Sequence, residues 1–398
     1  MSSETEVGQE RSDNETMIIK NGNVYLGNGL YKQGWDILCN GERIKEIGPE
    51  LSAKEGEEVI DAAGRDVYPG LVLGLCCVGA ISFSEMMSGP DMNETTSPVV
   101  PQLDIRDSFD LRELNMQRFA RAGITSYGLC PGVNALIGGQ ISLIHSQGLH
   151  AADVFIREHI GVKGNYTKTV KTVFSPKSVF MTRMGMYAYL DEAFRGAQEY
   201  MGKDGVPFDA GREVLCRLLR REIPFVVSAE NSTEIESVLH LGEKYNLRLT
   251  LTGGFGAAPY LKTIMDHEWH LMLGDTGFMM ANGTCGADRT ALEKMIAAYR
   301  KGLKLSIAGS GDLGYPCGYE QLLWQAARMS AVGASGAEIM DMMTVKPAEA
   351  LGVADLVGTL APGAYADVMI ANGNPATRFD NCAQRTIIAG RTAYVREE

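Results

Sequence analysis

The sequence predicts an α/β fold: a (β/α)8 TIM barrel with a small composite β-sandwich built from the two ends of the chain. Two patterns lead to this prediction. Through the middle of the chain, short apolar runs alternate with amphipathic helices, as in buried parallel strands separated by helices. Near both ends, apolar residues alternate with polar ones between glycine turns, as in β-meanders. A chain of 398 residues has room for one barrel and a companion domain.

The composition and net charge limit the classes of function that this chain can have. The chain is 45% hydrophobic and 22% charged, as expected for a globular protein with a full core. Its net charge of -12, without a long basic run, argues against nucleic acid and anionic membrane surfaces as partners. No apolar run is long enough to span a bilayer. The eight cysteines form no CxxC pair, so we expect reduced thiols and a cytoplasmic location.

The ends of the chain predict the domain boundaries. Residues 1–16 are polar and acidic, without the basic start and apolar core of a secretion signal, and we expect a mobile tail. Residues 17–68 and 357–398 show strand, glycine turn and strand, and we expect them to pair as the composite β-sandwich. Residues 69–356 then form the barrel.

The middle of the chain predicts individual barrel elements. Apolar runs that suit buried parallel strands lie at residues 123–130, 223–230, 247–254, 269–275 and 303–312. A helix over 185–201 presents one apolar face, formed by Met186, Leu190, Phe194 and Ala197. A helix over 231–246 begins with a capping box from Asn231 to Glu234. The glycine-rich residues 138–140 lack the Lys-Ser/Thr of a phosphate-binding loop and predict a turn.

Several stretches carry a family likeness. They include "VIDAAGRDVYPGLV" before the first barrel strand, "RAGITSYGLCPGVNALIGGQ" after it, and "TVKPAEALGVADLVGTLAPGAYADVMI" at the return to the sandwich. These stretches resemble the amidohydrolase superfamily, in particular its imidazolonepropionase-like branch, which opens cyclic amides and related C–N bonds. The resemblance implies the barrel with its composite domain.

The resemblance also implies where a metal site would lie. In the family, histidines on strands 1, 5 and 6 and an aspartate on strand 8 hold one or two metal ions that activate a water molecule. The matching histidine positions hold Leu75 and Cys77 on strand 1, Ser228 on strand 5 and Gly253 on strand 6. Asp312 matches the strand 8 carboxylate. Leucine and glycine side chains cannot coordinate a metal ion, so we predict that the inherited site is lost and expect no cofactor.

Two chemical alternatives stay open. Cys77, Glu230 and Asp312 are permitted ligands for a rebuilt zinc site. The same three residues are candidate acid, base or nucleophile in a metal-independent hydrolase. We favour neither alternative. A rebuilt metal site would lack a ligand at Leu75, whose side chain cannot coordinate an ion. A nucleophilic Cys77 would lack a neighbouring histidine to activate its thiol.

Four residues are candidate contacts for a substrate or another small ligand at the barrel mouth: Arg157, Lys163, Arg183 and Ser228. The resemblance matches Lys163 to a lysine in a charged strand segment, and we expect it to make a structural or anion contact. Arg183 is better explained as the start of a helix.

The favoured hypothesis is a degenerate amidohydrolase, or pseudoenzyme, that acts as a ligand-binding, structural or regulatory subunit. It would form a homo-oligomer or a hetero-oligomer with an active relative. The alternative is a metal-independent, or rebuilt-metal, hydrolase of cyclic amides or related C–N bonds.

Overall fold

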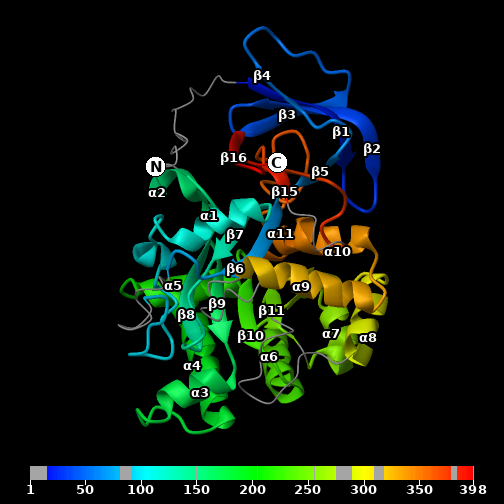
Figure 1. Ribbon diagram of the computed structural model, residues 1–398. Helices are drawn as coiled ribbons and strands as arrows, with labels where there is room; N and C mark the ends of the chain where they lie inside the picture. Colours follow the sequence, from blue (N-terminus) through cyan, green and yellow to red (C-terminus); the bar gives the residue numbers. More distant parts are fainter. Residues whose placement is uncertain are drawn as a thin grey trace.

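The computed structural model describes residues 16–80, 91–148, 150–203, 205–254, 256–274, 289–308, 318–377 and 383–397. Within these residues the strands form two sheets of eight strands each. One sheet curves into a nearly closed barrel, and the other lies at one end of it (Figure 1). The predicted tail falls largely outside the described residues, as does Asp312.

The barrel strands are β6 (Leu71–Cys76), β7 (Ile124–Leu129), β8 (Ile137–His145), β9 (Phe155–Asn165), β10 (Phe225–Ala229), β11 (Leu249–Gly253), β12 (His270–Leu273) and β13 (Lys304–Ile307). They follow one another in chain order around the sheet, and β13 also packs against β6. β9 to β13 are parallel to one another, as are β6 and β7. The predicted barrel is therefore confirmed.

β8 differs from the other barrel strands, because it runs antiparallel to both β7 and β9. The turn predicted at residues 138–140 is wrong, since these residues lie inside β8. Gly139 has a positive φ of 127°, and a Cβ atom there would lie 2.6 Å from the carbonyl oxygen of Leu103. Glycine at this position therefore admits the segment around Leu103, which pairs with β8 through bridges at Val99 and Asp104.

The second sheet, here called the composite sheet, contains β1 (Thr16–Tyr25), β2 (Tyr31–Asn40), β3 (Arg43–Pro49), β4 (Glu58–Asp61), β5 (Asp66–Pro69), β14 (Val368–Ala371), β15 (Ala383–Ile388) and β16 (Arg391–Val395). β5 lies between β1 and β14, so strands from both chain ends pair as expected. This pairing makes one connected sheet rather than two separate ones. The exact division into domains after residues 68 and 356 stays a prediction.

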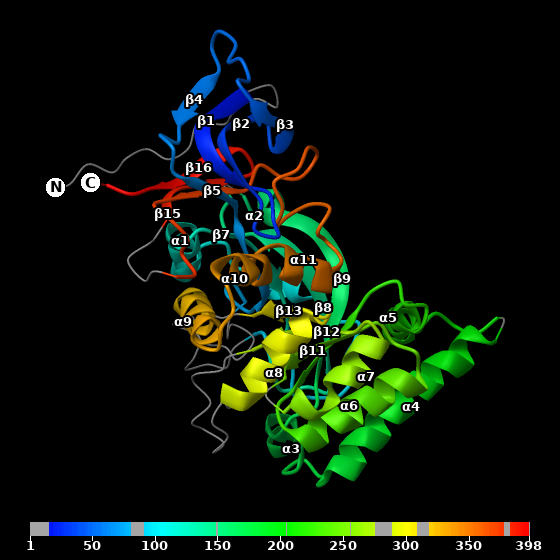
Figure 2. The same cartoon turned by 90° about the vertical axis from the view of Figure 1, so that its right-hand side faces the viewer.

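The helices are α1 (Leu114–Arg121), α2 (Ala151–Val154), α3 (Lys168–Phe174), α4 (Arg183–Met201), α5 (Ala210–Leu219), α6 (Ser232–Lys244), α7 (Leu261–Asp266), α8 (Arg289–Tyr299), α9 (Gly318–Ala331), α10 (Gly336–Met343) and α11 (Val345–Leu351). Figure 2 shows α4, α6, α7 and α8 together on one flank of the barrel. Among the described residues, no helix is long and apolar enough to cross a membrane.

Two helices match their predictions closely. The predicted apolar face of α4 is the buried one, formed by Met186, Leu190, Phe194 and Ala197. α6 begins with the predicted capping box, in which Asn231 accepts from the Glu234 N–H and Glu234 accepts from the Asn231 N–H.

The chain direction fixes which end of the barrel carries a site. β5 ends at Pro69 and β6 begins at Leu71, so the composite sheet lies where the parallel strands begin. The opposite end, where these strands finish, is called the barrel mouth. Functional residues of such barrels gather at that end.

Candidate functional site

The register of the parallel strands brings a row of residues side by side: Asn165, Ser228, Thr252, Met272 and Ser306. Phe225 on β10 packs against Phe194 of α4, with ring centroids 5.5 Å apart, so this position faces the helices. Side chains alternate between the two faces of a strand, and Ser228 therefore faces the barrel interior. Met272 of the same row crosses the interior, because a Cβ on Gly74 of β6 would collide with its sulfur.

Lys163 forms a compact cluster with two residues of this row. Its ammonium donates to Ser228 Oγ at 2.6 Å, to Asn165 Oδ1 at 2.5 Å and to the Gly164 carbonyl at 3.3 Å. Lys163 is fully buried. An ammonium group has three N–H donors, and these three acceptors match them. Lys163, Asn165 and Ser228 are called the Lys163 cluster below.

Asn165 anchors the cluster to the segment after β7. Its amide nitrogen donates to the carbonyls of Gly132 at 3.2 Å and Ala135 at 2.8 Å. Sequence reasoning selected Lys163 and Ser228 but missed Asn165. The signal was present, because Asn165 lies two residues after Lys163 and so faces the same side of an extended strand.

The two strand 1 positions, Leu75 and Cys77, lie in the buried apolar core. Leu75 is fully buried in the main core cluster. Cys77 is also fully buried, and its sulfur lies 4.0 Å from the sulfur of Cys130. Cys130 had no role in the sequence prediction.

Gly253, the predicted strand 6 position, does not share the face of Ser228. Its cross-strand neighbours are Ala229 and Leu273, whereas Ser228 pairs with Thr252. Cross-strand neighbours point to the same face of a sheet, so Thr252 rather than Gly253 faces the interior. Thr252 is fully buried, and its hydroxyl has no hydrogen-bond partner among the residues that the structure describes.

Glu230 lies at the rim of the mouth, directly after β10. It is half-buried, and its backbone N–H donates to Glu234 of α6 at 3.1 Å. Its Cγ would lie 3.8 Å from a Cβ on Gly253. Glu230 thus follows Ser228 on the same side of β10, toward the mouth.

The two predicted arginine contacts lie apart from the Lys163 cluster. Arg157 pairs with Asp355 at 2.9 Å and precedes Lys163 by six residues on β9. Such a stretch of strand spans about 20 Å, toward the end opposite the mouth. Arg183 is the exposed first residue of α4, as the helix-start interpretation expects, and its carbonyl accepts from the Tyr166 hydroxyl at 2.9 Å.

A second buried basic side chain lies nearer the start of the strands. His270 of β12 is 2.9 Å from Ser306 Oγ through its Nε2. Burial, reinforced by the positive charges of Lys346, Lys304 and Arg248, lowers the pKa of His270 to about 3. This histidine is a neutral core residue.

The donor set does not fit a divalent metal ion. At the described positions where the resemblance implies histidines, the side chains are aliphatic, thiol, hydroxyl or absent, and an ammonium group is hydrogen-bonded to one of them. No group of three His, Cys, Asp or Glu side chains among the described residues could hold a metal ion.

A cleft of about 510 Å³ lies beyond the segment that Asn165 anchors. Pro131, Asn134 and Gly138 form one side of it, and its lining includes four carboxylates, those of Asp91, Glu94, Asp104 and Asp107. Burial opposes ionisation of Asp104, but hydrogen bonds from Arg106 and His159 outweigh it and lower its pKa to about 2. This cleft is acidic, in contrast to the Lys163 cluster.

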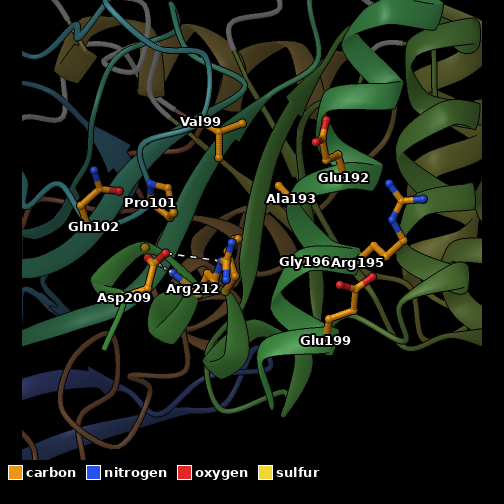
Figure 3. A pocket seen from close by; sticks show the side chains of 12 residues that line it. Val99, Pro101, Gln102, Glu192, Ala193, Arg195, Gly196, Glu199, Asp209 and Arg212 are labelled. Carbon is orange, nitrogen blue, oxygen red and sulfur yellow. Dashed lines mark hydrogen bonds and ion pairs between the residues drawn. The ribbon is translucent and has the colours of Figure 1, made fainter. Parts of the chain in front are cut away.

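A further cleft of about 470 Å³ lies between α4, α5 and the segment around Pro101 (Figure 3). Its charged side chains come from both helices, and Asp209 pairs with Arg212 at 3.4 Å. Its lining contains no Ser, Thr, Cys or His that could act as a nucleophile or base. The Lys163 cluster is therefore the better candidate site.

Comparisons with known proteins agree with this fold. The amidohydrolase family profile matches residues 201–393. A crystal structure of an amidohydrolase from Thermotoga maritima MSB8 is 22% identical, with a TM-score of 0.85 over 96% of this chain and all of that one. Molinate hydrolase is 16% identical, with a TM-score of 0.58 over 96% of this chain and 95% of its own. At these identities the likeness shows the fold alone.

A short sequence match has higher identity. A dihydroorotase from Lactobacillus johnsonii is 53% identical over 57 residues, which are 14% of this chain and 12% of that enzyme. The imidazolonepropionase-like branch stays a prediction. Residues 201–393 thus match the amidohydrolase family profile, and the chain shares its fold with amidohydrolases of known structure.

Proposed function

We propose that this chain is an amidohydrolase-superfamily protein that has lost metal-dependent hydrolysis and acts as a ligand-binding, structural or regulatory subunit. One observation supports this above the others: the buried ammonium of Lys163 lies 2.6 Å from Ser228, the position that the resemblance assigns to a metal-binding histidine. The ammonium group of Lys163 therefore lies close to the position at which related enzymes hold a metal ion.

Electrostatics supports the same proposal. A divalent ion 4 Å from an ammonium group would be repelled by about 8 kcal/mol at an effective dielectric constant of 20. Binding a metal there would require Lys163 to lose its proton or move. Loss of the proton would remove one of the three N–H donors, and movement would break the contacts to Ser228 and Asn165.

Metal analysis tests the proposal directly. The purified full chain is incubated with zinc, dialysed and measured by inductively coupled plasma mass spectrometry. We expect far less than one equivalent of zinc, manganese or iron. Retention of about one equivalent would contradict the proposal and favour the rebuilt site.

The structural part of the proposal predicts the effect of Lys163→Met. Because the substitution removes a buried donor that contacts Ser228 and Asn165, we expect a loss of about 3 kcal/mol in the free energy of unfolding. Lys168→Met, an exposed lysine at the start of α3, is the matched control and is expected to change it by less than about 0.5 kcal/mol. Equal changes in the free energy of unfolding for the two substitutions would contradict the stabilising role of the Lys163 cluster.

A hydrolase of cyclic amides or related C–N bonds, metal-independent or with a rebuilt metal site, is the second candidate, and the short match to a dihydroorotase favours hydrolysis in either form. A turnover screen on cyclic amides, dihydroorotate among them, separates the two candidates. We expect no turnover. Turnover abolished by Asp312→Asn or Cys77→Ser would favour the enzyme.

The proposed subunit role includes oligomerisation, either with itself or with an active relative, and a cytoplasmic location. Light scattering coupled to size-exclusion chromatography measures the oligomeric state. A strictly monomeric chain that captures no copy of an active relative would contradict a structural subunit.

A further inference from the structure

Two thiols meet at the barrel mouth. Cys77 follows β6 and Cys130 follows β7, and these strands are parallel neighbours. Their sulfur atoms lie 4.0 Å apart, and both side chains are fully buried.

The backbone holds these two residues beside each other. The Cys130 N–H donates to the Cys76 carbonyl at 3.0 Å, and Cys76 pairs in register with Leu129. Neighbouring strands lie about 4.8 Å apart, within the Cα separation of roughly 4.4–6.8 Å that a disulfide requires. Rotation of the two side chains can therefore bring the sulfurs to bonding distance without moving the strands.

The other thiols of the described residues have different surroundings. Cys76 Sγ accepts the Val78 N–H at 3.4 Å, and Cys216 Sγ donates to the Ala197 carbonyl at 3.7 Å. Cys39 lies in β2 of the composite sheet, and burial raises its pKa to about 12.

We propose that Cys77 and Cys130 are a redox pair that a small hydroperoxide converts into a disulfide across the barrel mouth. One thiolate attacks the peroxide oxygen, giving a sulfenic acid and releasing water or an alcohol once the leaving oxygen takes up a proton. The second thiolate then attacks the sulfenic sulfur, forming the S–S bond and breaking the S–O bond, and the departing hydroxide takes up a proton and leaves as water. The two thiols lose two electrons and two protons in total, and the peroxide is reduced.

The bond would tie β6 to β7 where both strands reach the mouth. It would close a loop between positions 53 residues apart, which stabilises the chain mainly by restricting its unfolded state. This inference is independent of the proposed function, because it requires only the two thiols and their spacing.

Peptide mapping of the oxidised full chain tests the inference. The protein is treated with hydrogen peroxide, the remaining thiols are alkylated, and the chain is digested without a reductant. We expect a linked pair of peptides containing Cys77 and Cys130, two hydrogens lighter than the separate peptides, which dithiothreitol dissociates. Persistence of both thiols, oxidation to sulfinic acid only, or linkage of either cysteine to a third one would overturn the inference.

A thermal readout accompanies the mapping. We expect the apparent Tm of the oxidised wild type to exceed that of the reduced protein by about 3 °C or more. Cys130→Ser should abolish this difference, whereas Cys76→Ser, the adjacent thiol, should keep it. If both variants lost the Tm difference between oxidised and reduced protein, or if both kept it, the assignment of the disulfide to Cys77 and Cys130 would be wrong.

Discussion

At the scale of single residues, the barrel interior holds two buried basic side chains with different surroundings. Lys163 donates to the Ser228 hydroxyl, the Asn165 side chain and the Gly164 carbonyl. His270 contacts the Ser306 hydroxyl, and its burial, reinforced by nearby positive charges, lowers its pKa to about 3. His270 is therefore neutral near pH 7.

His270 makes stability depend on pH. Its pKa is about 3 in the folded chain, against 6.5 when unfolded, so the unfolded state binds the extra proton as the pH falls below 6.5. This contribution to stability is complete above pH 6.5 and declines toward pH 3. Between pH 7.5 and pH 5 we expect a loss of about 2 kcal/mol from this residue.

Urea unfolding at the two pH values measures this loss. His270→Gln keeps a neutral polar group near Ser306 and removes the titration, so its decline should be smaller than that of the wild type by the same amount. Equal declines would show that His270 is protonated in the folded chain.

Two of the residues selected from the sequence, Lys163 and Ser228, are hydrogen-bonded to each other at 2.6 Å, and their role in a site stays a prediction. Arg157 was selected for its charge, but it lies six residues before Lys163 on the same strand, toward the far end of the barrel. Charge and residue type do not reveal where along a strand the mouth lies.

At the scale of elements, the start of α6 supports the rim of the mouth. Asn231 accepts the Glu234 N–H at 3.1 Å, and Glu234 in turn accepts the N–H groups of Glu230 and Asn231. The cap thus fixes the backbone of a candidate site residue as well as the helix end.

Asn231→Ala should lower the free energy of unfolding by about 1 kcal/mol, because one N–H at the start of the helix loses its acceptor. Urea denaturation followed by circular dichroism measures the change. Thr233→Ala, at an exposed position in the same helix, is the control and should change the value by less than about 0.5 kcal/mol. A neutral effect of Asn231→Ala would contradict the capping role.

The faces of α4 and α6 were predictable because a helical period of 3.6 residues directly relates sequence to burial. The strand β8 could not be predicted from a local pattern. Its glycines predict a turn in isolation, and they become strand residues because the segment around Leu103 packs against Gly139. That contact joins residues 36 positions apart, and no local pattern encodes it.

At the scale of the whole molecule, a buried polar contact connects the composite sheet to the barrel helices. The Tyr25 hydroxyl at the end of β1 donates to Asp341 of α10 at 2.7 Å, and Asp341 also accepts the Asn28 N–H. Burial raises the pKa of Asp341, although these hydrogen bonds oppose the shift.

Tyr25→Phe should lower the free energy of unfolding by about 1–3 kcal/mol, because the buried carboxyl group of Asp341 loses a donor. Tyr394→Phe, on the terminal strand β16 of the composite sheet, is the control, and its expected change is below about 0.5 kcal/mol. Differential scanning calorimetry measures both. Similar Tm values for the two variants would show that this contact does not stabilise the joint between sheet and barrel.

The sequence by itself determined the barrel and the pairing of the two chain ends, because periodicity and residue type are local properties. The tertiary structure alone decided which polar groups meet. Only strand register brings Lys163 to Ser228, Cys77 to Cys130 and Thr252 to the interior. Register depends on pairing between distant segments, and a shift of one residue would turn each of these side chains to the opposite face.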